Sequence, residues 1–433
     1  MESAQSYNRS LLRLLLINAL IKPIWILGID RWIQLEVGMA DYGTYFSVWG
    51  LTLTAGFLLD LGLTTYIQRT AANDPGSATR LADLFWLKML LIGAYLILIA
   101  TIDHFYPQLS STLLWGVAGI QVLNSLYLYV RSWITAAQYF SADVWFSILD
   151  KSLLIVLSIV WLSGIWGSIP INLDVFIACQ LLTLSISIGV VVYFLIKHQL
   201  PLPGQFRFSW AWVCSAWPYA AIVLLMSALA RLDGYWLTIW HANGAWEAGR
   251  FAAGYRLLDA ANMFGYLVAS FLLPYLARHR SDAAAVRSAI TRARVGLMLT
   301  SIIAVLVLLI FVKPIAALLY PGIHHSVATV MPVILTALMG YSLTHVYGTV
   351  LTANGELRFF QRVIGFFLLV HVALSYCWIP EWGALGSARA ALVSQLGTGL
   401  TLMHWVHRRN SIPQPISTYI VVIFTGCLVW ILN

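Results

Sequence analysis

The sequence has little charge. Only 10% of its 433 residues are Asp, Glu, Lys or Arg, whereas 60% are hydrophobic and the mean hydropathy is +0.82. A soluble domain carries about 25% charged residues, so the composition excludes an ordinary soluble protein. The apolar runs are also too long and too numerous for the strands of a β-barrel. The composition therefore predicts an all-α polytopic membrane protein without a sizeable soluble domain.

Cysteine is also scarce. The four cysteines are scattered along the chain and form no CxxC pair, so the sequence predicts neither a metal site nor a disulfide. The formal net charge of +8 does not indicate a nucleic-acid partner, because most basic residues fall in short loops between apolar runs. The first apolar run contains Lys22 and Pro23 and lacks a cleavage site after it, which is typical of a retained membrane span rather than a signal peptide.

The apolar runs predict about thirteen membrane-spanning helices, because about 20 apolar residues cross a bilayer. Most basic loop residues fall on the side of the N-terminus, and the other side holds only Arg31, Arg250, Lys313 and Arg389. By the positive-inside rule, this bias predicts a cytoplasmic N-terminus. The predicted spans are 11–35, 43–67, 81–102, 109–136, 142–164, 172–197, 212–240, 248–277, 290–319, 327–353, 359–379, 383–407 and 414–432.

Two stretches repeat one plan. Residues 22–69 and 218–278 each hold a span with a proline and a basic residue, an acid near the outer end, an outer turn with glycine, and a second span that ends at an arginine. The copies start six spans apart, so they have the same orientation and are related by a pseudo-two-fold axis along the membrane normal. We therefore expect a six-helix lobe at 1–200, a second at 201–410, an extra helix at 411–433, and a linker at 198–211.

Ionisable residues lie inside the hairpin from Trp217 to Arg278. Its two apolar runs contain Arg231, Asp233, Arg256 and Asp259. A charge near the bilayer centre costs roughly 3 kcal/mol, so such residues usually face a bundle interior or a water-filled cavity. The hairpin is therefore the predicted functional centre of the chain.

Four motifs resemble a known family of membrane proteins. They are VGMADYG at 37–43 with LDLGL at 59–63, GRFAAGYRLL at 249–258 with LPYL at 273–276, LTANGE at 351–356, and WGALGSA at 382–388. In this order they resemble the Wzx-type polysaccharide and O-antigen flippases of the multidrug/oligosaccharidyl-lipid/polysaccharide (MOP) exporter superfamily. The resemblance implies two six-helix lobes around a central cavity. It also implies that an undecaprenyl-diphosphate-linked oligosaccharide moves from the inner to the outer leaflet of a bacterial inner membrane.

The basic residues at membrane depth are the candidate binding groups. Arg256 is expected to grip the diphosphate, because its planar fork binds phosphate with two hydrogen bonds. Asp259, at i+3, either holds Arg256 in orientation or neutralises it as an ion pair. Arg231 is the second candidate. Lys22, which has the corresponding place in the first lobe, is the third.

The acids leave several alternatives open. Arg231 and Asp233 are at i and i+2, so each needs another partner, although Asp233 could also be solvated near the outer surface. Asp60 pairs with Lys22 or takes part in coupling to Na⁺ or H⁺. Lys88 is expected to reach toward the membrane surface. Asp150 and Lys151 are adjacent in sequence and are expected to point to different faces.

The function implied is that of a flippase for surface polysaccharide assembly, without enzymatic activity or a bound cofactor. Membrane lipid, a polysaccharide polymerase and a chain-length regulator are the further partners implied. The alternative is a cation-coupled multidrug or metabolite extruder of the same superfamily, which would need an acidic cavity. A membrane-embedded glycosyltransferase or polymerase is disfavoured, because such an enzyme needs a sizeable outer loop that the predicted spans do not leave.

Overall fold

The computed structural model is helical throughout the residues that it describes, which are 17–64, 67, 84–106, 110–164, 169–199, 210–279, 282–410 and 412–432, apart from 19 and 138. No strand occurs in these ranges. Eight of their helices are long and apolar enough to span a membrane, and a bent pair makes a ninth. The predicted all-α membrane class is therefore confirmed. The centre of the expected linker lies outside the described part. Some of the basic loop residues also lie outside it, namely Arg9, Arg13, Arg69, Arg80, Arg207 and Arg280.

The chain forms two compact units, and the first comprises Met1–Val37 and Val48–Leu224. Within it, α7 packs against α6, α8 and α9. Pro23 lies directly before the π-helical stretch η1, which is consistent with its missing backbone N–H. The helices of this unit are η1 (Ile24–Asp30), α2 (Arg31–Val37), the end of α3 (Met39–Ala55), η2 (Gly56–Leu59), α6 (Leu84–Phe105), α7 (Ser111–Ala136), α8 (Phe140–Leu162), α9 (Leu173–Lys197) and the first part of α10 (Trp210–Arg231).

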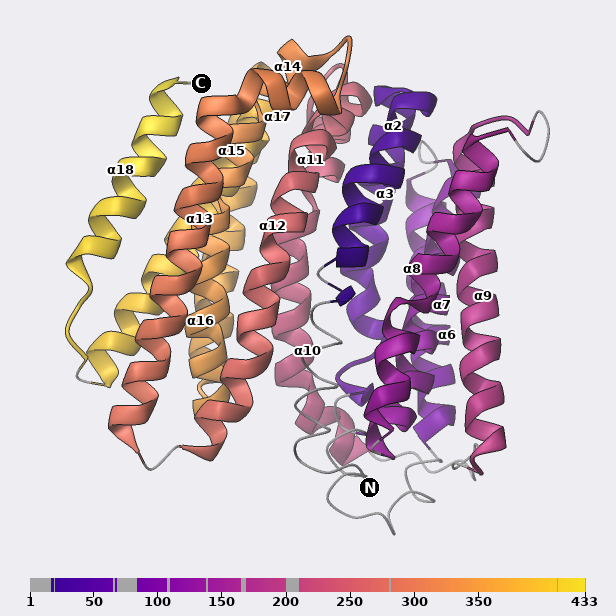
Figure 1. Cartoon of the computed structure of the whole chain (residues 1–433), viewed down its shortest axis with the longest axis horizontal. Coiled ribbons are helices and arrows are strands. Elements are labelled where there is room, and N and C mark those ends of the chain that lie inside the picture. Colours follow the sequence, from indigo (N-terminus) through magenta and orange to yellow (C-terminus); the bar gives the residue numbers. More distant parts are fainter. Residues whose placement is uncertain are drawn as a thin grey trace. The chain divides into compact units, whose positions relative to one another are not determined.

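The second unit comprises Gly38–Ser47 and Leu225–Asn433. Its central helix is α16, which packs against α12, α13 and α17 and is almost entirely buried. Within this unit α12, α13 and α16 run side by side (Figure 1). Besides the end of α10, its helices are α11 (Asp233–Trp240), α12 (Gly244–Arg278), α13 (Ala283–Leu319), α14 (His324–Ala328), α15 (Met331–Thr336), α16 (Leu338–Asn354), α17 (Leu357–Arg409) and α18 (Ile416–Leu432).

The 53-residue α17 is a helical hairpin rather than one straight helix. Its backbone leaves the helical region at Gly383, where φ is +52°. The ring of Phe359 stacks on that of Trp405 with centroids 4.1 Å apart, so the two halves run antiparallel. The halves match the predicted spans 359–379 and 383–407. The carboxylate of Glu247 accepts a hydrogen bond from the backbone N–H of Ala384 at 2.6 Å, which satisfies one of the free donors at the start of the second half.

The first turns of α3 and α12 cross at glycines within the second unit. A Cβ atom added at Gly43 would overlap the carbonyl oxygen of Ala245, and one added at Gly249 would overlap that of Met39. The two contacts are reciprocal, because Met39 and Gly43 have the same spacing as Ala245 and Gly249. The two glycine-bearing segments of the predicted repeat are therefore helical rather than turns, and they pack directly on one another. Such close backbone approach requires small residues.

Substitution of Gly43 by alanine should destabilise the protein by about 1–3 kcal/mol, because the added methyl group meets backbone that must shift. Gly93 in α6 is the matched control, since nothing lies within 4 Å of a Cβ atom added there. Gly93→Ala should be neutral or stabilising by up to about 1 kcal/mol. Thermal unfolding of both variants in detergent measures the difference, and equal effects would contradict the close crossing.

Candidate functional site

Arg231 lies in the second unit and is the last residue of α10, directly before the helix break between α10 and α11. The two helices are bent by 51° at Leu232. A helix break leaves carbonyl groups without intrahelical partners. Two of them are satisfied by side chains, since the Tyr255 hydroxyl donates to the Ala230 oxygen at 2.8 Å and the Gln395 amide donates to the Leu229 oxygen at 3.4 Å. Side chains from α12 and α17 thus stabilise the break between α10 and α11.

Arg231 forms a two-pronged ion pair with Asp259, from the middle of α12. Its Nη1 donates to Oδ2 at 2.8 Å, and its Nη2 donates to Oδ1 at 3.0 Å. The guanidinium also lies 5.1 Å from the centre of the Tyr255 ring. The side chains of Arg231 and Asp259 are 24% and 27% exposed, so the pair is accessible from one side.

Arg256 does not pair with Asp259, so the predicted orienting role of Asp259 is wrong. A spacing of i, i+3 brings two residues to one helix face, but here Asp259 has both oxygens occupied by Arg231. Arg256 is 5% exposed, and its Nη1 donates to the Tyr320 hydroxyl at 2.9 Å. Its guanidinium lies 4.4 Å from the centre of the Tyr42 ring. Aromatic groups therefore surround it on two sides.

Asp233 is not solvated, contrary to one of the predicted alternatives. It is 2% exposed, because α11 packs against the α17 hairpin. The Ser387 hydroxyl donates to its Oδ1 at 2.5 Å, and the His371 Nε2 lies 3.2 Å from the same oxygen. Ser387 and His371 come from the two halves of α17. Asp233 and His371 therefore form a buried acid–imidazole pair. The sequence did not indicate this pair, because more than 100 residues separate its two members.

In the first unit, Asp60 pairs with Lys88 rather than with Lys22. The predicted second span breaks after η2, where Leu61 and Gly62 have φ values of +43° and +82°. Lys88 is fully buried at this break. Its ammonium group donates to the Leu59 carbonyl at 2.7 Å, to Asp60 at 3.3 Å and to the Ser125 hydroxyl at 2.6 Å. The expectation that Lys88 reaches the membrane surface is therefore wrong, because the break supplies two acceptors, Leu59 and Asp60, and α7 supplies the third, Ser125.

Lys22 lies in a second group of charges in the first unit. Its charge interacts with those of Lys151, Asp150 and Arg131. Lys151 and Asp150 form an ion pair at 3.2 Å, so they do not point to different faces as predicted. Arg131 pairs with Asp143 at 2.9 Å. The structure thus separates Lys22 from Asp60 and brings it to other acids.

Several residues of these sites were not identified from the sequence. Tyr42, Tyr255 and Ser387 lie inside the motifs at 37–43, 249–258 and 382–388, but aromatic rings, hydroxyl groups and a lone histidine carry no spacing that assigns them a role. The residues concerned are Tyr42, Tyr255, Tyr320, His371 and Ser387. Within the described ranges, no group of His, Cys, Asp or Glu side chains is arranged to hold a metal ion.

No protein-family model matches the chain, and no curated protein matches it significantly. Solved structures do match. An MOP-superfamily transporter from Pyrococcus furiosus, described as having a binding pocket of reverse polarity, aligns with a TM-score of 0.69 at 14% identity, over 94% of this chain and 96% of that one. An inward-facing MATE-family multidrug resistance transporter aligns with a TM-score of 0.67 at 13% identity, over 92% of this chain and 98% of that one.

A third structure, the MATE transporter VcmN from Vibrio cholerae in its bent form, gives a TM-score of 0.62 at 15% identity, over 98% of this chain and 99% of that one. The match thus extends over nearly the whole of each chain. This chain therefore has the fold of the MATE transporters of the MOP superfamily. The superfamily-level fold that the motifs indicated is confirmed.

Proposed function

We propose that this protein is a multi-pass transporter that moves an undecaprenyl-diphosphate-linked oligosaccharide from the cytoplasmic to the outer leaflet of a bacterial inner membrane by alternating access. The observation that carries the proposal is the partly exposed Arg231–Asp259 pair beside a broken helix. A charge that faces hydrocarbon at mid-membrane costs roughly 3 kcal/mol, so the exposed side of this pair is best explained by water. Broken helices at membrane depth typically mark the binding sites of transporters.

The geometry of Arg231 suits a phosphate-bearing substrate. Its two terminal nitrogens hold the two oxygens of Asp259 side by side, and a phosphate group presents the same pair of acceptors. In the proposed cycle, the diphosphate takes the place of the Asp259 carboxylate on Arg231. Arg256, which lies in the same unit as Arg231, supplies further positive charge, and in the first unit Asp60 holds the break of the second span through Lys88.

The alternative is a cation-coupled multidrug extruder, and one observation favours it. Asp233 and His371 form a buried pair of titratable groups that could exchange a proton. Two of the matching structures are also described as multidrug resistance transporters. Under this alternative, a cationic substrate would displace Arg231 from Asp259. The proposed substrate therefore binds Arg231, whereas the substrate of the alternative function binds Asp259 of the same ion pair.

Reconstitution into liposomes tests the proposal. A fluorescent undecaprenyl-diphosphate oligosaccharide is incorporated, and a membrane-impermeant glycosidase reports how fast the saccharide reaches the opposite face. We expect the purified chain to speed this transfer at least about tenfold over protein-free vesicles, a reduction of the barrier by about 1.4 kcal/mol or more. Ethidium efflux in parallel vesicles tests the alternative. Transport of ethidium without any transfer of the saccharide would contradict the proposed substrate.

A further inference from the structure

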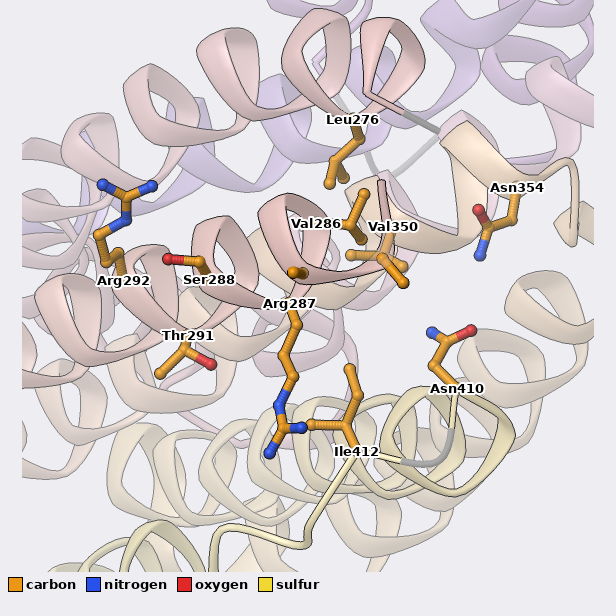
Figure 2. Close-up of a pocket in the computed structure, with 12 residues that line it drawn as sticks. Leu276, Val286, Arg287, Ser288, Thr291, Arg292, Val350, Asn354, Asn410 and Ile412 are labelled. Atoms are coloured by element: carbon orange, nitrogen blue, oxygen red, sulfur yellow. The ribbon is translucent and has the colours of Figure 1, made fainter. Parts of the chain in front are cut away.

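A cavity in the second unit has neither Arg231 nor Asp259 in its lining. It has a volume of about 780 Å³ and lies between the ends of α12, α13 and α16 and the segment after α17 (Figure 2). This volume is within the range of pockets that hold small ligands. It is lined by Leu276, Ala283, Ala284, Val286, Arg287, Ser288, Thr291, Arg292, Val350, Asn354, Asn410 and Ile412.

The polar part of this lining carries positive charge and no negative charge. Arg287 and Arg292 come from the start of α13, and no Asp or Glu is among the lining residues. The amide groups of Asn354 and Asn410 point toward one another across the cavity (Figure 2). Asp282, the acid nearest in sequence, accepts a hydrogen bond from the Ala285 backbone N–H at 2.9 Å as the N-cap of α13.

A half-buried arginine next to the lining residues in sequence, Arg294, adds to the positive charge of α13. Arg287, Thr291 and Arg294 are at i, i+4 and i+7, so they share one face of α13. The Nε and Nη1 atoms of Arg294 are buried, and neither has a hydrogen-bond partner among the described residues. The guanidinium as a whole is not isolated, because it interacts with the Tyr347 hydroxyl through charge and hydrogen bonding and with His407 through charge. Buried cationic donors without partners are costly unless an anion compensates them.

We propose that this cavity binds the phosphate headgroup of an acidic glycerophospholipid. Arginines and amides supply the hydrogen bonds that a phosphate accepts, and Leu276, Val350 and Ile412 provide an apolar wall for the glycerol and the first acyl carbons. Arg278 at the end of α12 and Arg408 at the end of α17 are the nearest further basic residues in sequence, whereas Arg409 is paired with Glu356 at 3.0 Å. Basic pockets between helices on the cytoplasmic side of a membrane are typical sites for anionic headgroups.

Titration calorimetry on the full chain in detergent tests this proposal, which does not depend on the transported substrate. The probes are dioctanoyl phosphatidylglycerol, dioctanoyl phosphatidylcholine and glycerol 3-phosphate. The test variant is Arg287→Gln with Arg292→Gln, because both side chains are exposed and can change without loss of the fold. The control is Lys313→Gln, which removes an exposed charge near the other end of α13.

We expect the phosphatidylglycerol probe to bind at least about tenfold more tightly than the other two probes, and the double variant to lose about tenfold or more of that affinity. Lys313→Gln should change the affinity less than about twofold. Equal affinity for glycerol 3-phosphate would overturn the lipid as the ligand. Equal affinity for phosphatidylcholine, or unchanged binding by the double variant, would overturn the phosphate site itself.

Discussion

Replacement of Lys88 by methionine is expected to destabilise the protein by about 3–5 kcal/mol, the usual cost of removing one partner from a buried charged group. Lys88 is fully buried, and its three donors satisfy Asp60, the Ser125 hydroxyl and the Leu59 carbonyl at the break of the second span. Methionine fills a similar volume but donates to none of the three acceptors; Asp60 then keeps the Thr64 hydroxyl at 2.8 Å, and the Leu59 carbonyl keeps only the Ser125 hydroxyl at 3.5 Å. Thermal or steric-trap unfolding in detergent micelles measures the loss.

A double-mutant cycle separates the ion pair from the other two contacts. Asp60→Asn removes the counter-charge of the fully buried Lys88, so this change alone should also cost about 3–5 kcal/mol. The Lys88→Met, Asp60→Asn protein should be more stable than the sum of the two single losses predicts, because the second change removes a group whose charged partner the first has already removed. Lys313→Met, an exposed lysine in α13, is the control. A Lys88→Met protein as stable as this control would show that the ammonium group does not hold the break.

Replacement of Arg231 by glutamine is expected to reduce transport of the lipid-linked saccharide about 100-fold. This factor corresponds to about 2.7 kcal/mol, which is the scale of one to two hydrogen bonds to a charged group. Arg231→Lys should recover part of the rate, because it keeps the charge but not the two-pronged geometry. The liposome assay with the fluorescent undecaprenyl-diphosphate oligosaccharide measures all three proteins.

The Asp259→Asn variant distinguishes the two proposed substrates when it is compared with Arg231→Gln, because it removes the other half of the same ion pair. If Arg231 binds the diphosphate, the Asp259→Asn protein should keep transport within about threefold of the original, and the double variant should be no better than Arg231→Gln alone. The unfolding temperature of each variant controls for damage to the fold. A larger loss in Asp259→Asn than in Arg231→Gln would contradict the anionic substrate and favour the cationic one.

The sequence located the ionisable residues at membrane depth but not the partners that they have in the structure. Charged residues inside an apolar run are visible in a sequence, because they break the pattern that the bilayer demands. Arg231, Asp233, Arg256 and Asp259 were found in this way. Which charge meets which depends on helix packing and side-chain rotamers, and the helix-face rule suggested Arg256–Asp259 where the structure has Arg231–Asp259.

The sequence by itself determined the helical membrane class and the approximate position of each helix, because a backbone in hydrocarbon must satisfy its own hydrogen bonds and the apolar length must match the bilayer. Only the tertiary structure decided where the helices break and which distant residues stabilise those breaks. The reason is that the groups freed at a break, such as the Leu59 and Ala230 carbonyls, are satisfied by side chains from other helices, Lys88 and Tyr255, whose positions no local pattern encodes.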